Sequence, residues 1–456
     1  MTSSVGVSPG PVTRAPAVQR DGPLSRLDTA TTPGRLGLLL VGLVLLSLAW
    51  GVLAALTAEQ HASAASDVVA VSEPLSLDAE QIYQSLSDAD ATAASAFLVG
   101  GLEPAADLQR YNADIAQAAI RIEAASALLG TSAARTQSPG HPNQQASTAG
   151  SATGDDLAIL SAELPVYADE VGTARADNRI GYPLGAAYLR EASTLLRGTL
   201  LPAASDIYTK ENGLLTSASA QATGLPLLVV TFLFGLGAGS LLYLSWRWLT
   251  RRTHRRVNYG LLVAAVAGAV SLVWLVGAFF FGRAELLHAQ QHGSAPAEAF
   301  ARADVAALQA HADESLTLID NTGDDSYQKD FIAQQKLLGP GPGTLLAAVQ
   351  ASAGDDSAAA DAQAWYRAHA ELRALDDSGN HTAAVQSALN GQASATFTRL
   401  SADLSGGIGA HQAVFASDAR GGRDAFTGLA VGMIVASLIM AASCAWGLNR
   451  RLAEYR

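Results

Sequence analysis

A short basic stretch near the middle of the chain, residues 246–256, constrains the fold most. Apolar runs without a charged residue flank it on both sides, at residues 224–245 and 257–281. Each run is long enough to cross a hydrocarbon core of about 30 Å at about 1.5 Å per helical residue. Arginine-rich loops resist translocation, so we expect this stretch to stay in the cytoplasm between two spans. It carries five arginines and no acidic residue: Arg247, Arg251, Arg252, Arg255 and Arg256.

Two further uncharged apolar runs lie near the ends of the chain, and 49% of all residues are apolar. Such a composition is typical of a membrane protein. Strand patterns are nearly absent, because few segments alternate apolar and polar residues. The sequence therefore predicts an all-α integral membrane protein with four transmembrane helices, at residues 36–56, 224–245, 257–281 and 425–448.

The charges are divided unevenly along the chain. The short polar segments, 1–35, 246–256 and 449–456, hold 12 arginines against three acidic residues. The two long segments, about 58–223 and 282–424, hold 17 Lys and Arg against 38 acidic residues. The positive-inside rule predicts a multi-pass cell-membrane protein with both termini in the cytoplasm and both long segments outside. We expect residues 1–35 to form a disordered cytoplasmic tail and residues 449–456 a short one. Ala62-Ser63-Ala64 resembles a signal-peptidase site, but the preceding tail and apolar run favour an uncleaved anchor.

The two long segments read as helical bundles, residues 57–223 and 282–424, in a duplicated span–bundle–span arrangement. In support of the duplication, Tyr188-Leu189-Arg190 with Leu195 matches Phe397-Thr398-Arg399 with Leu404 in spacing. Gly100-Gly101 and the Gly-Pro run 339–343 are expected to end helices, and Pro202 and Pro226 to bend them. The polar, low-complexity residues 131–153 predict a flexible loop. The expected helices cover residues 76–99, 104–129, 155–178, 184 to the second span, 285–319, 326–338, 345–375 and 381–424.

No catalytic motif is present: the chain lacks Gly-x-Ser-x-Gly, a phosphate-binding loop with lysine, and His-Glu-x-x-His. We therefore expect no enzyme, no cofactor and no nucleic-acid partner. The spans hold no Asp, Glu, Lys, Arg or His, which counts against a pump or a charge-lined channel. His288 and His292 lie four residues apart, a spacing that can bind a metal; solvated helix histidines are the more common case, and we expect no metal.

Two charged surfaces each allow two interpretations. The acidic long segments are usual for a solvated surface, although they could also dock a basic partner. The Arg247–Arg256 loop anchors the topology and attracts anionic head groups; alternatively it docks an acidic cytoplasmic protein, together with Arg450 and Arg451.

One stretch resembles a known family. Ala187-Tyr188-Leu189-Arg190-Glu191-Ala192-Ser193-Thr194-Leu195-Leu196 is followed by Leu200-Leu201-Pro202-Ala203-Ala204 and Tyr208. This stretch, the four-span plan and the arginine-rich loop resemble the actinobacterial GlnX-type membrane proteins. The resemblance implies partners: an extracytoplasmic glutamine- or amino-acid-binding lipoprotein and the cytoplasmic Ser/Thr protein kinase G. Its motif residues here are Tyr188, Leu189, Arg190, Ser193, Pro202 and Tyr208.

The resemblance implies a non-enzymatic signal relay. Extracellular amino-acid availability, sensed through the lipoprotein, would reach a kinase that regulates glutamate and 2-oxoglutarate metabolism. Two alternatives stay open: a chemoreceptor-like sensor that binds a small molecule directly, and a membrane scaffold or transporter accessory subunit. The sequence also leaves open whether the protein forms a homodimer.

Overall fold

The computed structural model describes residues 32–67, 69–70, 73–136, 144–253, 258–320, 325–354 and 356–453. Within these ranges the chain is helical and holds no strand, which confirms the all-α prediction. Helical stretches long and apolar enough to cross a membrane number four in these ranges: Leu36–Ser66, Pro226–Trp248, Tyr259–Ile319 and His381–Arg450. The fold is therefore that of an all-α membrane protein with four candidate spans.

The chain divides into two compact units. The membrane unit comprises residues up to Leu56, Val229–Trp274, and Ala430 onward. The bundle unit comprises Thr57–Leu228, called the first segment here, and Leu275–Leu429, the second segment. The sequence assigned each long segment to a bundle of its own; in the structure, both segments belong to one compact unit.

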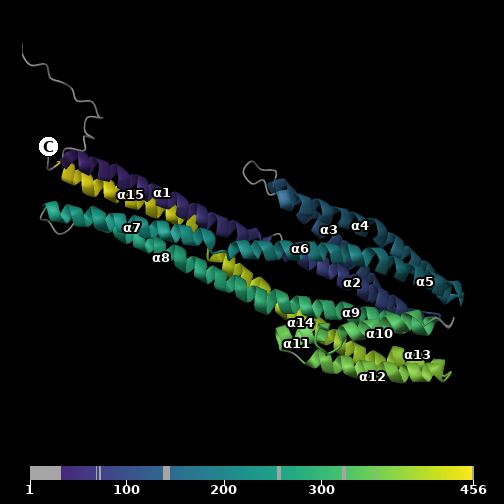
Figure 1. The fold of residues 1–456 in the computed structure, drawn as a ribbon. Helices are drawn as coiled ribbons and strands as arrows, with labels where there is room; N and C mark the ends of the chain where they lie inside the picture. Colours follow the sequence, from purple (N-terminus) through teal and green to yellow (C-terminus); the bar gives the residue numbers. More distant parts are fainter. Residues whose placement is uncertain are drawn as a thin grey trace, which may run out of the picture. The chain divides into compact units, whose positions relative to one another are not determined.

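The membrane unit is built from parts of α1 (Thr32–Asp67), α7 (Pro226–Thr253), α8 (Tyr259–His288) and α15 (Leu429–Ala453) (Figure 1). Small residues let these helices approach closely, as is usual in membranes. A Cβ on Gly235 would lie 2.7 Å from the Trp50 ring, and one on Gly260 would lie 2.5 Å from the Gly447 Cα. Trp50 Nε1 also donates a hydrogen bond of 3.2 Å to Ser271 Oγ, which ties α1 to α8.

The first segment of the bundle unit forms long helices around one apolar core. Gly100 and Gly101 both have φ of +65°, so they end α2 where the sequence predicts. The core includes Leu75, Ile82, Tyr167 and Leu189. The helices are α2 (Glu73–Leu98), α3 (Ala105–Thr136), α4 (Gln144–Arg179), α5 (Leu184–Leu195), the π-helix η3 (Leu196–Leu200) and α6 (Leu201–Ala222).

The second segment packs shorter helices around an aromatic core. Phe300, Phe331 and Trp365 are each at most 2% exposed at its centre. The helices are the π-helix η4 (Ala289–Ser294), α9 (Ala295–Ile319), α10 (Ser326–Leu338), α11 (Leu345–Ala353), α12 (Ser357–Asp377), α13 (His381–Asn390) and α14 (Gln392–Asp424).

Several predicted boundaries need correction. Residues 131–136 and 144–153, expected in a flexible loop, are helical, and residues 137–143 lie outside the described ranges. Their alanine and glutamine content favours helix despite the low complexity. The helix expected at 345–375 is broken at Gly354, whose φ is +72°. The helix expected at 381–424 is broken at Gly391, where a Cβ would lie 2.7 Å from the Ser387 Cα.

The two segments meet along α2 and α9. Leu316 of α9 belongs to the core of the first segment, and Ala91 of α2 belongs to the core of the second. Both helices are rich in buried alanines, and these small side chains let the two backbones approach. The long segments are thus joined by a shared apolar boundary, which also contains acidic side chains.

Candidate functional site

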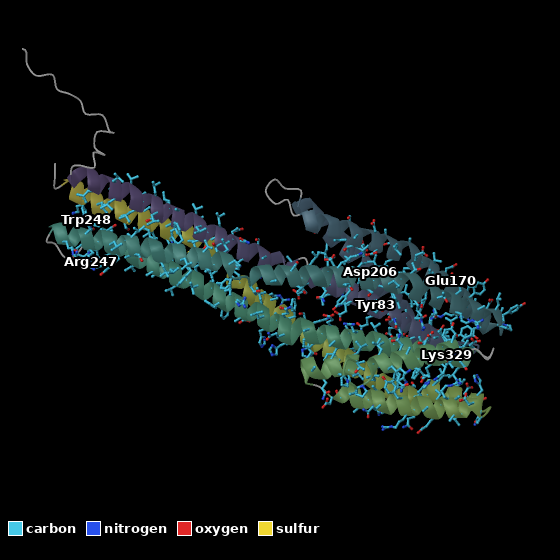
Figure 2. The ribbon with its side chains drawn as sticks, viewed as in Figure 1. Tyr83, Glu170, Asp206, Arg247, Trp248 and Lys329 are labelled. Carbon is cyan, nitrogen blue, oxygen red and sulfur yellow. The ribbon has the colours of Figure 1, made fainter. Side chains whose placement is uncertain are left out.

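A cavity of about 480 Å³ lies where the two segments of the bundle unit meet. We call it the inter-segment cavity. α2 and α6 of the first segment form one side, and α9, α10 and α11 of the second form the other. Figure 2 labels Tyr83, one of the α2 residues in this wall. Its polar lining is Glu80, Tyr83, Gln84, Ser205, Tyr208, Thr209, Asn212, Glu298, Arg302, Gln309 and Gln334.

Carboxylates and amides are held in place around this cavity by hydrogen bonds. Asn212 Nδ2 donates to Glu298 Oε2 at 3.2 Å. Gln84 Nε2, in the α2 wall, donates to Asp304 Oδ2 of α9 at 2.6 Å. Among the bonds described, both oxygens of Glu80 accept only long bonds, each 3.4 Å, from the same donor, Gln412 Nε2. The acceptor capacity of Glu80 is therefore largely unused by protein donors.

Burial raises the pKa of two of these carboxyl groups. It raises the pKa of Glu80 to about 7; the hydrogen bond from Gln412 opposes the rise, and the charges of Glu298 and Asp304 add to it. It also raises the pKa of Asp304 to about 7, against the hydrogen bond from Gln84. Arg302 lies at the rim, with its Nη1 3.9 Å from Glu298 Oε1. The site is thus suited to a cationic group, because a positive charge would favour the ionised carboxylates.

A second cavity, of about 420 Å³, shares Tyr83, Ser205, Gln309 and Gln334 with the first. Its wall contains Arg197, which lies in the π-helix η3. Arg197 Nη1 donates to Asp313 Oδ1 at 2.5 Å, and its Nη2 lies 3.5 Å from Asp90 Oδ2. One guanidinium therefore bridges α2 and α9 across the boundary between the segments. π-Helices occur often at functional sites.

A second buried ionic cluster lies inside the second segment. Glu314 is fully buried and accepts a 2.7 Å hydrogen bond from His369 Nδ1, while His311 Nδ1 lies 3.5 Å from its other oxygen. Burial alone raises the pKa of this carboxyl, but the two imidazoles outweigh it and lower the pKa to about 2. The imidazoles stack on Phe331 and Phe397. No group of three or more candidate metal ligands occurs among the residues that the structure describes.

The residues of the family-like motif surround the boundary between the segments. Leu189 lies in the core, with Tyr188 packed against it. Arg190 Nη1 pairs with Asp320 Oδ1 at 3.1 Å, and Ser193 Oγ donates to Asp90 Oδ1 at 2.6 Å. Pro202 lines the second cavity and Tyr208 the first. Arg399, the predicted counterpart of Arg190, lies instead 3.7 Å from Asp361 within the second segment.

The predicted docking arginines are only partly described. Arg247 and Arg251 are exposed on α7, one helical turn apart, and Figure 2 labels Arg247 beside Trp248. Arg450 is exposed on α15, with its guanidinium 5.8 Å from the Trp446 ring centre. Arg255 and Arg256 lie outside the described residues, as do the side chains of Arg252 and Arg451.

His288 and His292 are exposed on helices, as expected of solvated histidines, whereas several acidic residues differ from expectation. His288 Nδ1 donates to Asp418 Oδ2 at 2.6 Å, and its ring stacks on His292. Of the acids interpreted as a solvated surface, Asp90, Asp304, Asp313 and Glu314 are at most 3% exposed. One signal could have indicated their burial: Asp90 and Asp304 follow alanine within alanine-rich, apolar helix faces.

Residues 64–220, about a third of the chain, match the family described as the actinobacterial sensor domain. No curated protein and no solved structure gives a significant match. The matched range runs from before α2 to residue 220 in α6, and it includes the α2, η3 and α6 residues that line the two cavities on the first-segment side. The match supports an actinobacterial sensor membrane protein and indicates a sensing or signalling role.

Proposed function

We propose that this protein is a non-enzymatic transmembrane signal relay whose input is a small molecule bound in the inter-segment cavity. The sensor-domain match supports the sensing role, and the four candidate spans support the membrane setting. The cavity itself is the main support for direct binding of a small molecule. Its walls come from both segments, so a bound molecule would contact both. Such a ligand can bias the arrangement of the segments by its differential contacts.

The chemistry of the cavity favours a ligand with an ammonium group. Glu80 and Glu298 supply carboxylates, and Tyr83 and Tyr208 supply aromatic rings; both groups attract ammonium ions. Arg302 at the rim would meet a carboxylate on the same molecule. Amino acids satisfy both requirements, which agrees with the amino-acid input that the family resemblance implies. A cavity of 480 Å³ is adequate for such a molecule.

The cytoplasmic part of the relay is assigned from the distribution of charge. Both termini and the Arg247–Arg256 loop lie in the cytoplasm in this scheme, because the short segments carry the arginines. The loop, with Arg450 and Arg451, would recruit a cytoplasmic Ser/Thr kinase that regulates glutamate and 2-oxoglutarate metabolism. In a second version of the relay, the signal comes from an extracytoplasmic amino-acid-binding lipoprotein instead of a small molecule in the cavity. The resemblance favours this version, and an exposed face of the bundle unit would then dock the liganded lipoprotein.

Replacing Glu80 with glutamine is expected to weaken ligand binding roughly tenfold or more, since a charge-assisted hydrogen bond becomes neutral. The full-length protein in lipid nanodiscs would be titrated calorimetrically with amino acids and linear amines. Affinity should fall as the pH drops below about 7, where Glu80 takes up a proton. Glu123→Gln makes the same charge change at an exposed site on α3 and should leave binding unchanged. If no ammonium compound binds, the proposal that this protein binds its ligand directly is wrong.

A crosslinking pull-down of the full-length protein from its own cells tests the relay. With amino acids present, we expect a soluble kinase to be recovered in an amount that differs from the amount without them. Replacing Arg247 and Arg251 with glutamine should reduce this recovery while membrane insertion persists. Recovery of an exported binding protein, together with no direct ligand binding, would select the second version. Recovery of a transporter and no kinase would contradict the relay.

A further inference from the structure

An apolar groove in the membrane unit ends at a pair of arginines. It has a volume of about 1130 Å³ and lies between α1 and α7. Arg247, Trp248 and Arg251 form its end on α7 (Figure 2). Six leucines make its walls: Leu38, Leu39, Leu43, Leu46, Leu241 and Leu244.

The charge at this end is positive. Arg247 and Arg251 are four residues apart, so both guanidinium groups emerge on one face of α7. Among the residues that the structure describes, none of those lining the groove is acidic. Two adjacent guanidinium groups match a phosphate, which they can bind through several N–H donors. Tryptophan commonly lies at the level of the head groups in a membrane.

We propose that this groove binds one anionic phospholipid. The phosphate lies on Arg247 and Arg251, and an acyl chain follows the leucine walls. A free phosphate would use only the arginines and leave the apolar walls without an occupant, whereas a phospholipid uses both. The inference is independent of the kinase relay. It gives Arg247 and Arg251 a ligand other than a protein.

Gly42 offers a way to close the groove. It lines the wall on α1, and a Cβ built on it meets no atom within 4 Å. A phenylalanine at this position would therefore extend into the groove without a clash at its Cβ. Gly237, on α7, is also exposed with no atom within 4 Å of a Cβ, and it does not line the groove. It provides a matched control.

Native mass spectrometry of the full-length protein, equilibrated with phosphatidylglycerol or phosphatidylcholine, tests the proposal. The wild type should retain one phosphatidylglycerol in preference to phosphatidylcholine. Gly42→Phe should lose retention of both lipids. The double variant Arg247→Gln, Arg251→Gln should lose the preference for phosphatidylglycerol, roughly tenfold or more. Gly237→Phe should behave as the wild type. Equal retention of the two lipids by the wild type, or unchanged retention by Gly42→Phe, would overturn the proposal.

Discussion

Replacing Arg197 with methionine is expected to destabilise the bundle unit by about 3–5 kcal/mol. The guanidinium is the cation that separates Asp90 from Asp313, and both carboxylates are at most 3% exposed. Methionine keeps much of the aliphatic volume but leaves two buried acids facing each other. Thermal unfolding of the full-length protein in detergent should show the bundle unit melting roughly 5–10 °C earlier.

The pH dependence separates a lost charge from lost packing. Burial raises the pKa of Asp313 to about 7 even though the Arg197 charge opposes the rise. Without Arg197 the pKa of Asp313 rises further, so the folded variant holds a proton that the unfolded chain releases above about pH 4. The loss of stability should therefore be smaller at pH 5.5 than at pH 8. Arg110→Met removes an exposed pair with Asp88 and should cost at most about 1 kcal/mol. Equal losses for the two variants, or no dependence on pH, would contradict the bridging role.

Much of the fold follows from local sequence. Uncharged runs of sufficient length predict the four candidate spans because a membrane excludes charge. Gly100-Gly101 predicts the end of α2, and residues 339–343 predict the break before α11, because glycine and proline end helices by local sterics. The breaks at Gly354 and Gly391 were missed because a single glycine inside a helical pattern is often tolerated.

The pairing of the segments could not be predicted. α2 and α9 are both rich in alanine, and an alanine face has no shape or charge that specifies its partner. The contact joins residues more than 200 positions apart in the chain, such as Gln84 and Asp304. Whether such a surface meets another segment, solvent or a second copy depends on the tertiary arrangement, which periodicity does not encode.

The candidate site was only partly predictable, for the same reason. Tyr208 and Pro202 were selected through the family-like motif, and both line cavities. Glu80, Glu298 and Arg302 were not selected, because acids and arginines on a helix are usually solvated. The catalytic and metal motifs sought in the sequence depend on fixed spacing within one segment. A site made from two distant segments has no such spacing.

Replacing Glu314 with leucine should destabilise the bundle unit by about 3–4 kcal/mol, because the buried imidazole of His369 loses its hydrogen-bond acceptor and that of His311 loses the neighbouring carboxylate. Both rings stack on phenylalanines, so apolar groups cover a face of each imidazole. Thermal unfolding at pH 6.5 would measure the loss. Glu371→Gln, an exposed site on the same helix as His369, should change stability by less than about 0.5 kcal/mol.

A triple variant shows whether the three side chains act as one unit. If Glu314, His311 and His369 are all replaced with leucine, these three positions no longer hold a buried donor without an acceptor, so most of the single-variant loss should be recovered. The pKa of Glu314 in the fold, about 2, lies below the ordinary value of 4.5. Its stabilisation is therefore fully present above about pH 4.5 and disappears as the pH falls toward 2. Relative to the triple variant, the wild type should lose stability across that acidic interval. Additive losses from the three replacements would instead mean that each side chain contributes only its own packing.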